Sequence, residues 1–246
     1  MILLLAGTAE ARRLAALLAE HRIPAEASLA GATREPAPLP LPTRIGGFGG
    51  SEGFTAYLDS HPIAAVIDAT HPFAACITSR THAICSARNL PLLRVERPAW
   101  TPGPGDRWTF VADESEAMRL IPETATVFLA TGRQSLPAWA TLRARTTYLR
   151  VIDPPAEPFP LPGDYVTAHP PFDRAAEWDL FRRLAITHLV VKDAGGPDSR
   201  PKLDAARDLG IEVLILRRPD PPEGLQIVRT VDEALAWAVA LSFSSA

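Results

Sequence analysis

The chain has 246 residues, of which 47% are hydrophobic and 22% charged, and its formal net charge is −3 at pH 7. This length accommodates one large α/β domain or two smaller ones, each with its own core. The slightly negative charge argues against a nucleic-acid-binding protein, which usually carries a strongly basic face, and no apolar run approaches the roughly 20 residues that a membrane-spanning helix needs.

The first hundred residues alternate between the patterns of buried strands and of helices. Strands are predicted at 2–6, 25–30, 43–45, 64–69 and 92–95, and helices at 9–20, 51–59 and 73–88. This alternation is typical of an open, doubly wound parallel sheet with right-handed crossovers. The apolar stretch 1–6 lacks the basic leader and cleavage site of a signal peptide, so we expect a cytoplasmic protein.

A proline- and glycine-rich segment at 98–106 predicts a linker, after which a second alternation begins. Strands are predicted at 108–111, 126–130, 146–151, 188–191, 212–216 and 226–228, and helices at 114–120, 174–184, 201–209 and 231–241. The proline-dense stretch 154–171 predicts one long loop, which at that length is often functional. We therefore expect an α/β protein of two Rossmann-like lobes with parallel sheets, 1–100 and 107–246, and an active site in the cleft between them.

Two cysteines fall in one predicted helix. Cys76 and Cys85 are nine positions apart, which puts them on opposite faces, so they cannot pair within that helix. No Cys/His spacing typical of a metal site surrounds them, and we expect both to be small, buried apolar residues. We assign them no chemistry and expect no metal.

Glycines at the strand-to-helix turns of the first lobe predict an edge that binds phosphate. Gly7 and Thr8 form the first turn, where helix amides favour an anion, although the full G-x-G-x-x-G fingerprint is absent and an ordinary tight turn also explains the glycine. The segment GGFGG is more specific, because its glycines free backbone N–H groups to approach a ligand; a glycine-rich hairpin is the alternative. Its residues are Gly46, Gly47, Phe48, Gly49 and Gly50.

The end of the second predicted strand indicates which nucleotide is bound. An acidic residue there would accept hydrogen bonds from the ribose of NAD, whereas this chain has Ser28, Gly31, Thr33 and Arg34. A hydroxyl and a guanidinium suit the 2′-phosphate of NADP. The alternative is that Arg34 is only an exposed loop residue.

The segment DATHPFA, residues 68–74, brings several polar groups to the end of the fourth strand. We expect Asp68, Ala69 and Thr70 to lie beside the cofactor, although Asp68 has the alternative role of a helix cap. A histidine after a strand is more often structural than catalytic, and His71 is our candidate acid or base.

Cationic side chains lie at or near several predicted strand ends, most of them in the second lobe. They occur beside small residues in GRQSL (132–136) and KDAGG (192–196). Arginine binds carboxylates bidentately and lysine acts as a point charge, so these side chains would hold carboxylates if they line a cleft. Solvation at the surface is the alternative for each one singly. The candidates are Arg97, Arg133, Arg150, Lys192, Lys202 and Arg217.

Taken in order, GTAEA, GGFGG, DATHPFA, ERPAW, GRQSL and KDAGG with the downstream Lys202 resemble the signature series of the precorrin-6A reductase family. Each motif alone is weak, but their order and spacing over nearly the whole chain are specific. The resemblance implies an NADP-dependent oxidoreductase of cobalamin (vitamin B12) biosynthesis that acts on a CH–CH bond, with two Rossmann-like lobes.

The family resemblance also implies a mechanism. A hydride passes from carbon 4 of the nicotinamide of NADPH to carbon 19 of precorrin-6A, and a proton reaches carbon 18 to give precorrin-6B. Because the cofactor supplies the chemistry, the protein mainly positions the reactants. We take Lys192 and His71 as the candidate catalytic residues, with water as another proton source, and Arg97, Arg133, Lys192 and Lys202 as ligands of the tetrapyrrole carboxylates.

Three alternatives remain open at this point. The first is a cobalt-precorrin-6A reductase of the anaerobic pathway, which uses the same fold. The second is a non-catalytic sensor that binds NADP or a small anion, which would need no cationic set in the second lobe. The third is an NADP-dependent reductase of another polycarboxylated substrate. For the main reading we expect the tetrapyrrole as partner, with no nucleic acid or membrane and only transient contact with neighbouring pathway enzymes.

Overall fold

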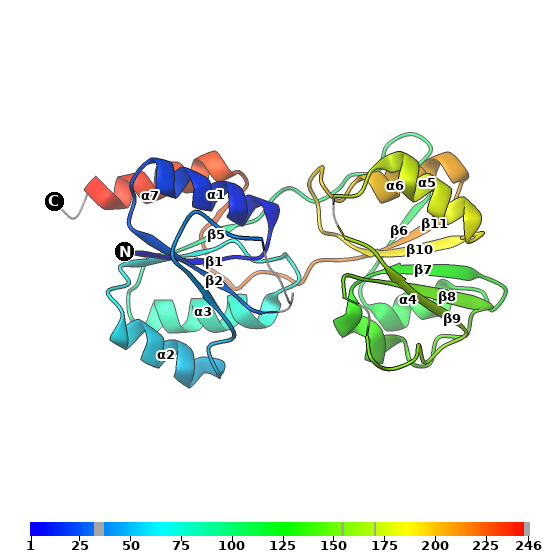
Figure 1. Cartoon of the computed structure of the whole chain (residues 1–246), viewed down its shortest axis with the longest axis horizontal. Helices are drawn as coiled ribbons and strands as arrows, with labels where there is room; N and C mark the ends of the chain where they lie inside the picture. The colour runs from blue at the N-terminus through cyan, green and yellow to red at the C-terminus, as the bar shows by residue number, and fades with distance from the viewer. Residues whose placement is uncertain (32–36, 154, 170, 244–246) are drawn as a thin grey trace. The chain divides into compact units, whose positions relative to one another are not determined.

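The computed structural model describes residues 1–31, 37–153, 155–169 and 171–243. The chain divides into two compact units: unit 1 comprises Met1–Pro98 and Pro219–Ala246, and unit 2 comprises Ala99–Arg218. Each unit holds a six-stranded sheet flanked by helices (Figure 1). The predicted α/β class with two parallel-sheet lobes is confirmed.

Unit 1 is built on a parallel sheet. Its strands are β1 (Ile2–Leu5), β2 (Ala25–Leu29), β3 (Thr43–Ile45), β4 (Ala65–Asp68), β5 (Leu92–Val95) and β12 (Ile227–Val228). Its helices are α1 (Ala9–Glu20), α2 (Gly50–Ser60), α3 (Ala75–Ala87) and α7 (Val231–Phe243). The strands lie in the order β12-β5-β4-β1-β2-β3, and each neighbouring pair is parallel.

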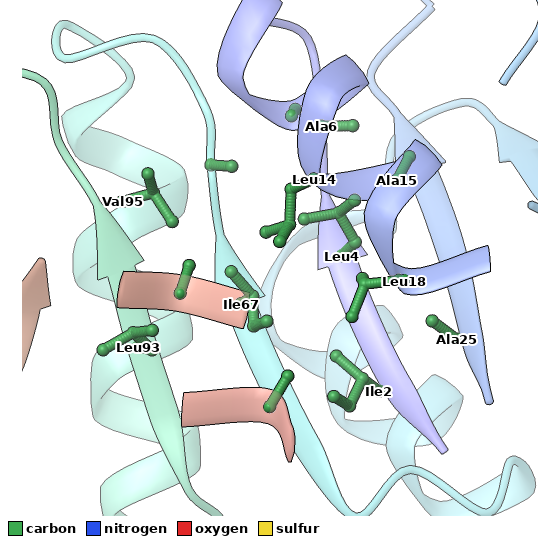
Figure 2. Close-up of a cluster of buried hydrophobic side chains, with 14 of the residues drawn as sticks. Ile2, Leu4, Ala6, Leu14, Ala15, Leu18, Ala25, Ile67, Leu93 and Val95 are labelled. Carbon is green, nitrogen blue, oxygen red and sulfur yellow. The ribbon is translucent and has the colours of Figure 1, made fainter. Parts of the chain in front are cut away.

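Helices cover both faces of this sheet, as the sequence of β1 requires. All four of its residues are buried apolar side chains, which is typical of a central parallel strand that is covered on both sides. Ile2 and Leu4 pack in the core formed with α1 and α7 (Figure 2). Leu3 and Leu5 point to the opposite face, where α2 and α3 cover them.

The direction of winding reverses at the centre of the sheet. From β1 the chain adds β2 and β3 on one side, then crosses back to place β4 and β5 on the other. In open α/β sheets, ligands bind at the carboxyl ends of the strands where this reversal occurs. The ends of β1 and β4 are therefore the expected position of a ligand site in unit 1.

Unit 2 repeats the order of five of these strands around β7, but its outer position next to β11 holds β6, the first strand of the unit, where unit 1 has its last, β12. Its strands are β6 (Trp108–Val111), β7 (Thr126–Ala130), β8 (Thr146–Val151), β9 (Gly163–Thr167), β10 (His188–Lys192) and β11 (Glu212–Leu216). They lie in the order β6-β11-β10-β7-β8-β9, again all parallel. The helical segments are α4 (Glu114–Leu120), the 3-10 helix η1 (Arg133–Trp139), α5 (Arg174–Arg183) and α6 (Pro201–Leu209). The reversal in this unit falls between β7 and β10.

The predicted extent of the second lobe, 107–246, is wrong at its C-terminal end. β12 pairs with β5, with Val228 opposite Val95, and α7 contributes Ala234 and Ala238 to the core of unit 1. Residues 219–246 thus return to the first unit. The sequence pattern predicts that a strand and a helix form there, but a two-residue strand carries no information on which sheet it joins.

Three smaller differences concern unit 2 and the cysteines. The predicted loop 154–171 contains the edge strand β9, whose residues are all partly or fully exposed and so lack a buried-strand pattern. The helix η1 was not predicted because it contains Pro137. Cys85 is buried as expected, but Cys76 is exposed. Among the described residues, no helix is both long and apolar enough to cross a membrane.

Candidate active site

The ends of β1 and β4 are tied together at the reversal point of unit 1. Thr8 caps α1 with an extended backbone, and its side-chain oxygen accepts a hydrogen bond of 3.1 Å from the Ala11 amide. The same hydroxyl donates to the Ala69 carbonyl oxygen at 2.8 Å. Gly7 has φ +132°, and nothing lies within 4 Å of the position that a Cβ would take. The turn therefore leaves open space at the N-terminus of α1, where an anion is favoured.

The glycine-rich turn between β3 and α2 is anchored by its one aromatic residue. The ring of Phe48 packs edge-on against Phe54 and Tyr57, with centroid distances of 4.8 and 5.1 Å. Gly49 and Gly50 have φ of +77° and +91°, a conformation that favours glycine. No atom lies within 4 Å of where their Cβ atoms would be. The ring is thus held inside while the backbone stays open to a ligand.

At the end of β2, a side chain that the sequence analysis did not consider contacts Ser28. Ser28 is buried, and its hydroxyl accepts a hydrogen bond of 2.8 Å from Nη1 of Arg44 on β3. Sequence reasoning missed Arg44, because its place opposite Ser28 depends on the pairing of β2 with β3. Gly31 lies beside Gly46: a Cβ on Gly31 would be 3.7 Å from the Cα of Gly46. Thr33 and Arg34 lie outside the described residues.

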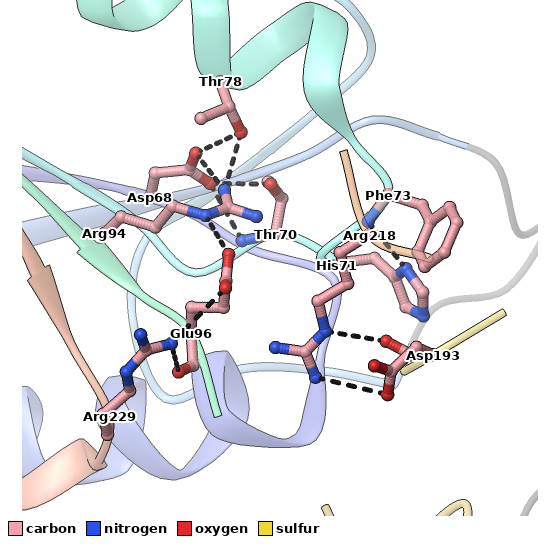
Figure 3. A network of polar contacts seen from close by, with 10 residues as sticks. All are labelled: Asp68, Thr70, His71, Phe73, Thr78, Arg94, Glu96, Asp193, Arg218 and Arg229. Atoms are coloured by element: carbon pink, nitrogen blue, oxygen red, sulfur yellow. Dashed lines mark hydrogen bonds and ion pairs between the residues drawn. The ribbon is translucent and has the colours of Figure 1, made fainter. Parts of the chain in front are cut away.

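Asp68 is the centre of a buried polar network at the end of β4 (Figure 3). Its Oδ1 accepts hydrogen bonds from the amide of Thr70 at 3.0 Å and from the Thr70 hydroxyl at 2.6 Å. Its Oδ2 accepts from Thr78 at 2.6 Å and from Arg94 at 2.7 Å. The carboxylate therefore fixes the segment after β4 to α3 and β5, rather than capping the first turn of α3.

His71 comes directly after Thr70 of this network in the chain. Its Nδ1 accepts a hydrogen bond of 3.2 Å from the amide of Phe73 (Figure 3). Because Nδ1 is the acceptor, the neutral ring carries its proton on Nε2. In the neutral form, Nε2–H is therefore the hydrogen-bond donor of the ring.

Arg97 follows the end of β5 and contacts α1. It donates to Glu10 of α1 at 2.5 Å, and the two side chains are 14% and 15% exposed. With Arg13 and Arg229 it lines a groove of about 540 Å³ between α1 and the start of α7. Arg97 therefore lies in a groove whose three arginines are partly neutralised by Glu10 and Asp232.

In unit 2, the turn after β7 is held by small polar side chains. The hydroxyls of Thr131 and Ser135 lie 2.6 Å apart, and Ser135 donates to the Gly132 carbonyl at 2.8 Å. Gly132 has φ +82°, with open space where a Cβ would be. Arg133 begins η1 with its side chain 59% exposed and lies 3.7 Å from Glu157.

Lys192 ends β10, next to the end of β7 in the sheet. Burial lowers the pKa of its ammonium group below 10.5, and the negative charge of Glu114 partly opposes this shift. The following residue, Asp193, accepts a hydrogen bond of 3.2 Å from the amide of Trp100. Its backbone carbonyl accepts another, of 2.8 Å, from Arg218.

Lys202 and Trp100 attach to the same turn. Lys202 is 9% exposed, donates to the Ser199 carbonyl at 2.6 Å and lies 5.7 Å from the centroid of the Trp100 ring. Trp100 in turn donates to the Gly196 carbonyl at 2.8 Å. Trp100, the last residue of ERPAW, and the KDAGG segment, almost a hundred residues further along the chain, therefore form one local structure within unit 2.

Two other arginines of the predicted set have local roles. Arg150 is buried and donates to Glu177 at 2.7 Å, with its guanidinium 4.8 Å from the centroid of Phe128. Arg217 lies over Phe110 at 5.5 Å. Within the part of the chain that the structure describes, no group of three His, Cys, Asp or Glu side chains is placed to hold a metal.

A family model described as "Precorrin-6x reductase CbiJ/CobK" matches residues 1–239. The chain belongs to this family. The resemblance inferred from the ordered motifs is thereby confirmed.

Relatives support the same assignment over the full length. The chain is 44% identical over 244 residues to "Precorrin-6A reductase" from Rhodococcus erythropolis, covering 98% of each protein. It is 27% identical over 235 residues to "Cobalt-precorrin-6A reductase" from Priestia megaterium, covering 89% of this chain and 91% of the relative. The solved structure of "CobK precorrin-6A reductase" superimposes with a TM-score of 0.92 at 42% identity, covering 97% of this chain and 96% of that one.

The structure gathers the predicted residues into two sets. In unit 1, the turns that follow β1, β2, β3 and β4 lie along one edge of the sheet, because the strands are parallel. In unit 2, Arg133 and Lys192 lie at the ends of the neighbouring strands β7 and β10. Sequence reasoning identified the turns but missed the side chains that hold them, which are Arg44, Thr78 and Arg94.

Proposed function

We propose that this protein catalyses the reduction of precorrin-6A to precorrin-6B with NADPH, in cobalamin biosynthesis. The observation that carries the proposal is its membership of the precorrin-6x reductase family over residues 1–239. Relatives named precorrin-6A reductase are 44% and 43% identical over nearly the whole chain. The lower identity of 27% to a cobalt-precorrin-6A reductase supports the metal-free substrate.

The residues of unit 1 fit a dinucleotide. The turn at Gly7 and Thr8 offers helix amides to the pyrophosphate, and the open backbone of 46–50 offers close approach to the rest of the molecule. We expect Asp68 to act here through Thr70, because protein donors occupy its carboxylate. When bound, NADPH supplies the hydride that reduces the macrocycle.

The protein's own task is positional and includes one proton transfer. Lys192 and Arg133 are suited to bind carboxylates of the tetrapyrrole, because both lie at the carboxyl edge of the unit 2 sheet. Lys202 acts indirectly, by holding Trp100 and the turn that follows Lys192. For the proton to carbon 18, the candidates are Nε2 of His71 and the ammonium of Lys192.

The test is an anaerobic assay with purified protein, NADPH and precorrin-6A. Loss of nicotinamide absorbance, coupled to a change in the macrocycle spectrum, is the expected result. Cobalt-precorrin-6A serves as the second substrate and NADH as the second reductant. Turnover only with the cobalt compound would overturn the metal-free assignment. Binding of NADPH without its oxidation in the presence of either tetrapyrrole would overturn the reductase function.

A further inference from the structure

The strand β3 carries an arginine that belongs to none of the motifs quoted above. Arg44 lies directly opposite Ser28 in the register between β2 and β3. Its Nη1 donates to the Ser28 hydroxyl and to the Gly46 carbonyl, each at 2.8 Å, and its Nη2 donates to the Gly47 carbonyl at 3.2 Å. The side chain therefore crosses the strand end and reaches the glycine-rich turn.

The guanidinium of Arg44 is held in a fixed plane, and some of its N–H groups are not used by the protein. It stacks over the ring of Phe48 at 4.0 Å from the centroid and lies 5.3 Å from that of Tyr57. Three of its five N–H groups serve the bonds just described, so the Nε–H and one Nη2–H remain. A guanidinium with two such donors is suited to bind two oxygens of a doubly charged phosphate group.

Ser28 adds a third donor at the same place. Its oxygen accepts from Arg44, so its own hydroxyl hydrogen is left to donate to a ligand. An acid on this face of β2 would repel a phosphate, and Glu26 lies two residues before Ser28. Its carboxylate, however, accepts a hydrogen bond of 2.5 Å from Tyr57, whose pKa is raised to about 12 by burial and by that bond. Tyr57 thus stays protonated and holds Glu26 on the α2 side.

We propose that Arg44, with Ser28, binds the 2′-phosphate monoester of the adenosine ribose and so makes the enzyme selective for NADPH over NADH. This inference rests on the proposed function for its reductant. It assigns the selectivity to β3, rather than to the loop after β2 on which the sequence places Thr33 and Arg34. The position fits the general rule that the end of the second strand reads the ribose substituents.

A purely structural role for Arg44 makes a different prediction. If it only holds the Gly46 and Gly47 carbonyls, its loss would disturb the turn and weaken both dinucleotides equally. Selectivity therefore separates the two roles. The informative quantity is the ratio of the dissociation constants for NADPH and NADH, measured without any tetrapyrrole.

The experiment compares Arg44→Gln, Arg44→Lys and Ser28→Ala with the wild-type protein by isothermal titration calorimetry. The probes are NADPH, NADH and the fragments 2′,5′-ADP and 5′-ADP. For Arg44→Gln we expect the Kd of NADPH and of 2′,5′-ADP to rise about 10- to 100-fold, the size of a lost charge-assisted hydrogen bond. The Kd of NADH and of 5′-ADP should change less than about twofold, and Arg44→Lys should recover part of the selectivity.

The matched control is Arg88→Gln, which removes an arginine paired with Asp59 on the surface of the same unit. It should leave all four constants unchanged. Equal losses for NADPH and NADH in Arg44→Gln, or no loss in either, would overturn the assignment. A fourth variant, Ser28→Asp, should repel NADPH selectively, and an unchanged ratio there would also count against the proposal.

The outcome is independent of the reaction assay. If the wild-type protein binds NADPH selectively but does not reduce precorrin-6A, the proposed function fails and the role of Arg44 stands. If the wild-type protein reduces precorrin-6A with NADH as readily as with NADPH, the function stands and the role of Arg44 fails.

Discussion

The Thr8 hydroxyl donates a hydrogen bond of 2.8 Å to the carbonyl oxygen of Ala69, 61 residues further along the chain. This bond fastens the turn after β1 to the turn after β4. The same oxygen caps α1 through the Ala11 amide. One side chain therefore sets both the start of the helix and the spacing of the two turns at the reversal point.

We expect Thr8→Val to lower the free energy of unfolding by about 1–2 kcal/mol, because it removes an N-cap while keeping the shape of the side chain. It should also raise the Kd for NADPH, since the two turns are no longer fastened. Thr8→Ser should restore both properties. Urea unfolding and calorimetric titration measure the two effects.

A matched control for this prediction is Thr230→Val. Thr230 also accepts a hydrogen bond from a helix amide, that of Glu233, in the same unit. Its loss should lower stability without changing NADPH affinity. A similar loss of affinity in both variants would show that the effect of Thr8 is only a general loss of stability.

The buried pair of Asp68 and Arg94 gives a second prediction. Their side chains are 1% and 2% exposed and 2.7 Å apart. Arg94→Met leaves the carboxylate buried without its cation, which should cost about 3–5 kcal/mol in the free energy of unfolding. Combining it with Asp68→Asn should cost less than the sum of the single changes, because the most deeply buried side chain at this place then no longer carries a charge.

The measurement is a double-mutant cycle by urea unfolding at pH 7. Arg88→Met serves as the control, since its partner Asp59 is exposed and the unfolding midpoint should not change. Additive effects of the two buried changes would contradict the coupling inferred from the network.

Two glycines at or near the glycine-rich turn 46–50 give a third prediction, with opposite outcomes. A Cβ on Gly53 would lie 1.7 Å from the carbonyl oxygen of Phe48, whereas a Cβ on Gly47 would meet nothing within 4 Å. Gly53→Ala should therefore displace the turn and lower both stability and NADPH affinity. Gly47→Ala should keep the melting temperature and weaken NADPH binding only, where the dinucleotide needs the open space.

Thermal unfolding and NADPH titration of these two variants provide the check. An unchanged melting temperature in Gly53→Ala would mean that the backbone of α2 relaxes away from Phe48. Unchanged NADPH affinity in Gly47→Ala would mean that the dinucleotide does not approach this part of the turn.

The elements that the sequence predicts well are those whose pattern is local. The apolar run of β1 and the turn at Gly7 and Thr8 suffice to predict a buried strand followed by a helix, as the structure has it. The glycines of the turn at 46–50 are likewise recognisable because they sit between a strand and a helix. These features depend on neighbours in the chain, which a sequence displays directly.

What the sequence does not reveal are the partners that come from distant segments. Asp68 looks like a free polar group at a strand end, and only the sheet order brings Arg94 against it. Arg44 was overlooked because Arg34 lies closer in sequence to the end of β2, although the register places Arg44 opposite Ser28. Lys202 looks like a surface cation and is instead mostly buried beside Trp100.

The lowered pKa of Lys192 gives a fourth prediction, on pH dependence. Burial lowers the pKa of the folded protein's ammonium below the ordinary 10.5. Between these two pKa values the unfolded chain binds more protons, so this group makes stability rise with pH there. Below both values the cost of burying the charge is present in full.

Lys192→Met should accordingly be more stable than the wild-type protein at neutral pH, and the difference should shrink as the pH approaches 10.5. Urea unfolding at several pH values gives the comparison. The same variant should lose turnover or affinity for precorrin-6A. Unchanged turnover and substrate affinity would remove Lys192 from the site, and a constant stability difference would contradict its burial as an ammonium group.

Unit 2 is an insertion, because the chain leaves unit 1 after Pro98 and returns at Pro219. During synthesis, every strand of unit 2 has left the ribosome before β12 and α7 of unit 1 are made. Until then, α1 lacks the contact with Ala234 and Ala238, and β5 is an open sheet edge. Unit 1, although first in the chain, is therefore the last to complete its fold, and its unfinished edge is the point at which a nascent chain is open to aggregation.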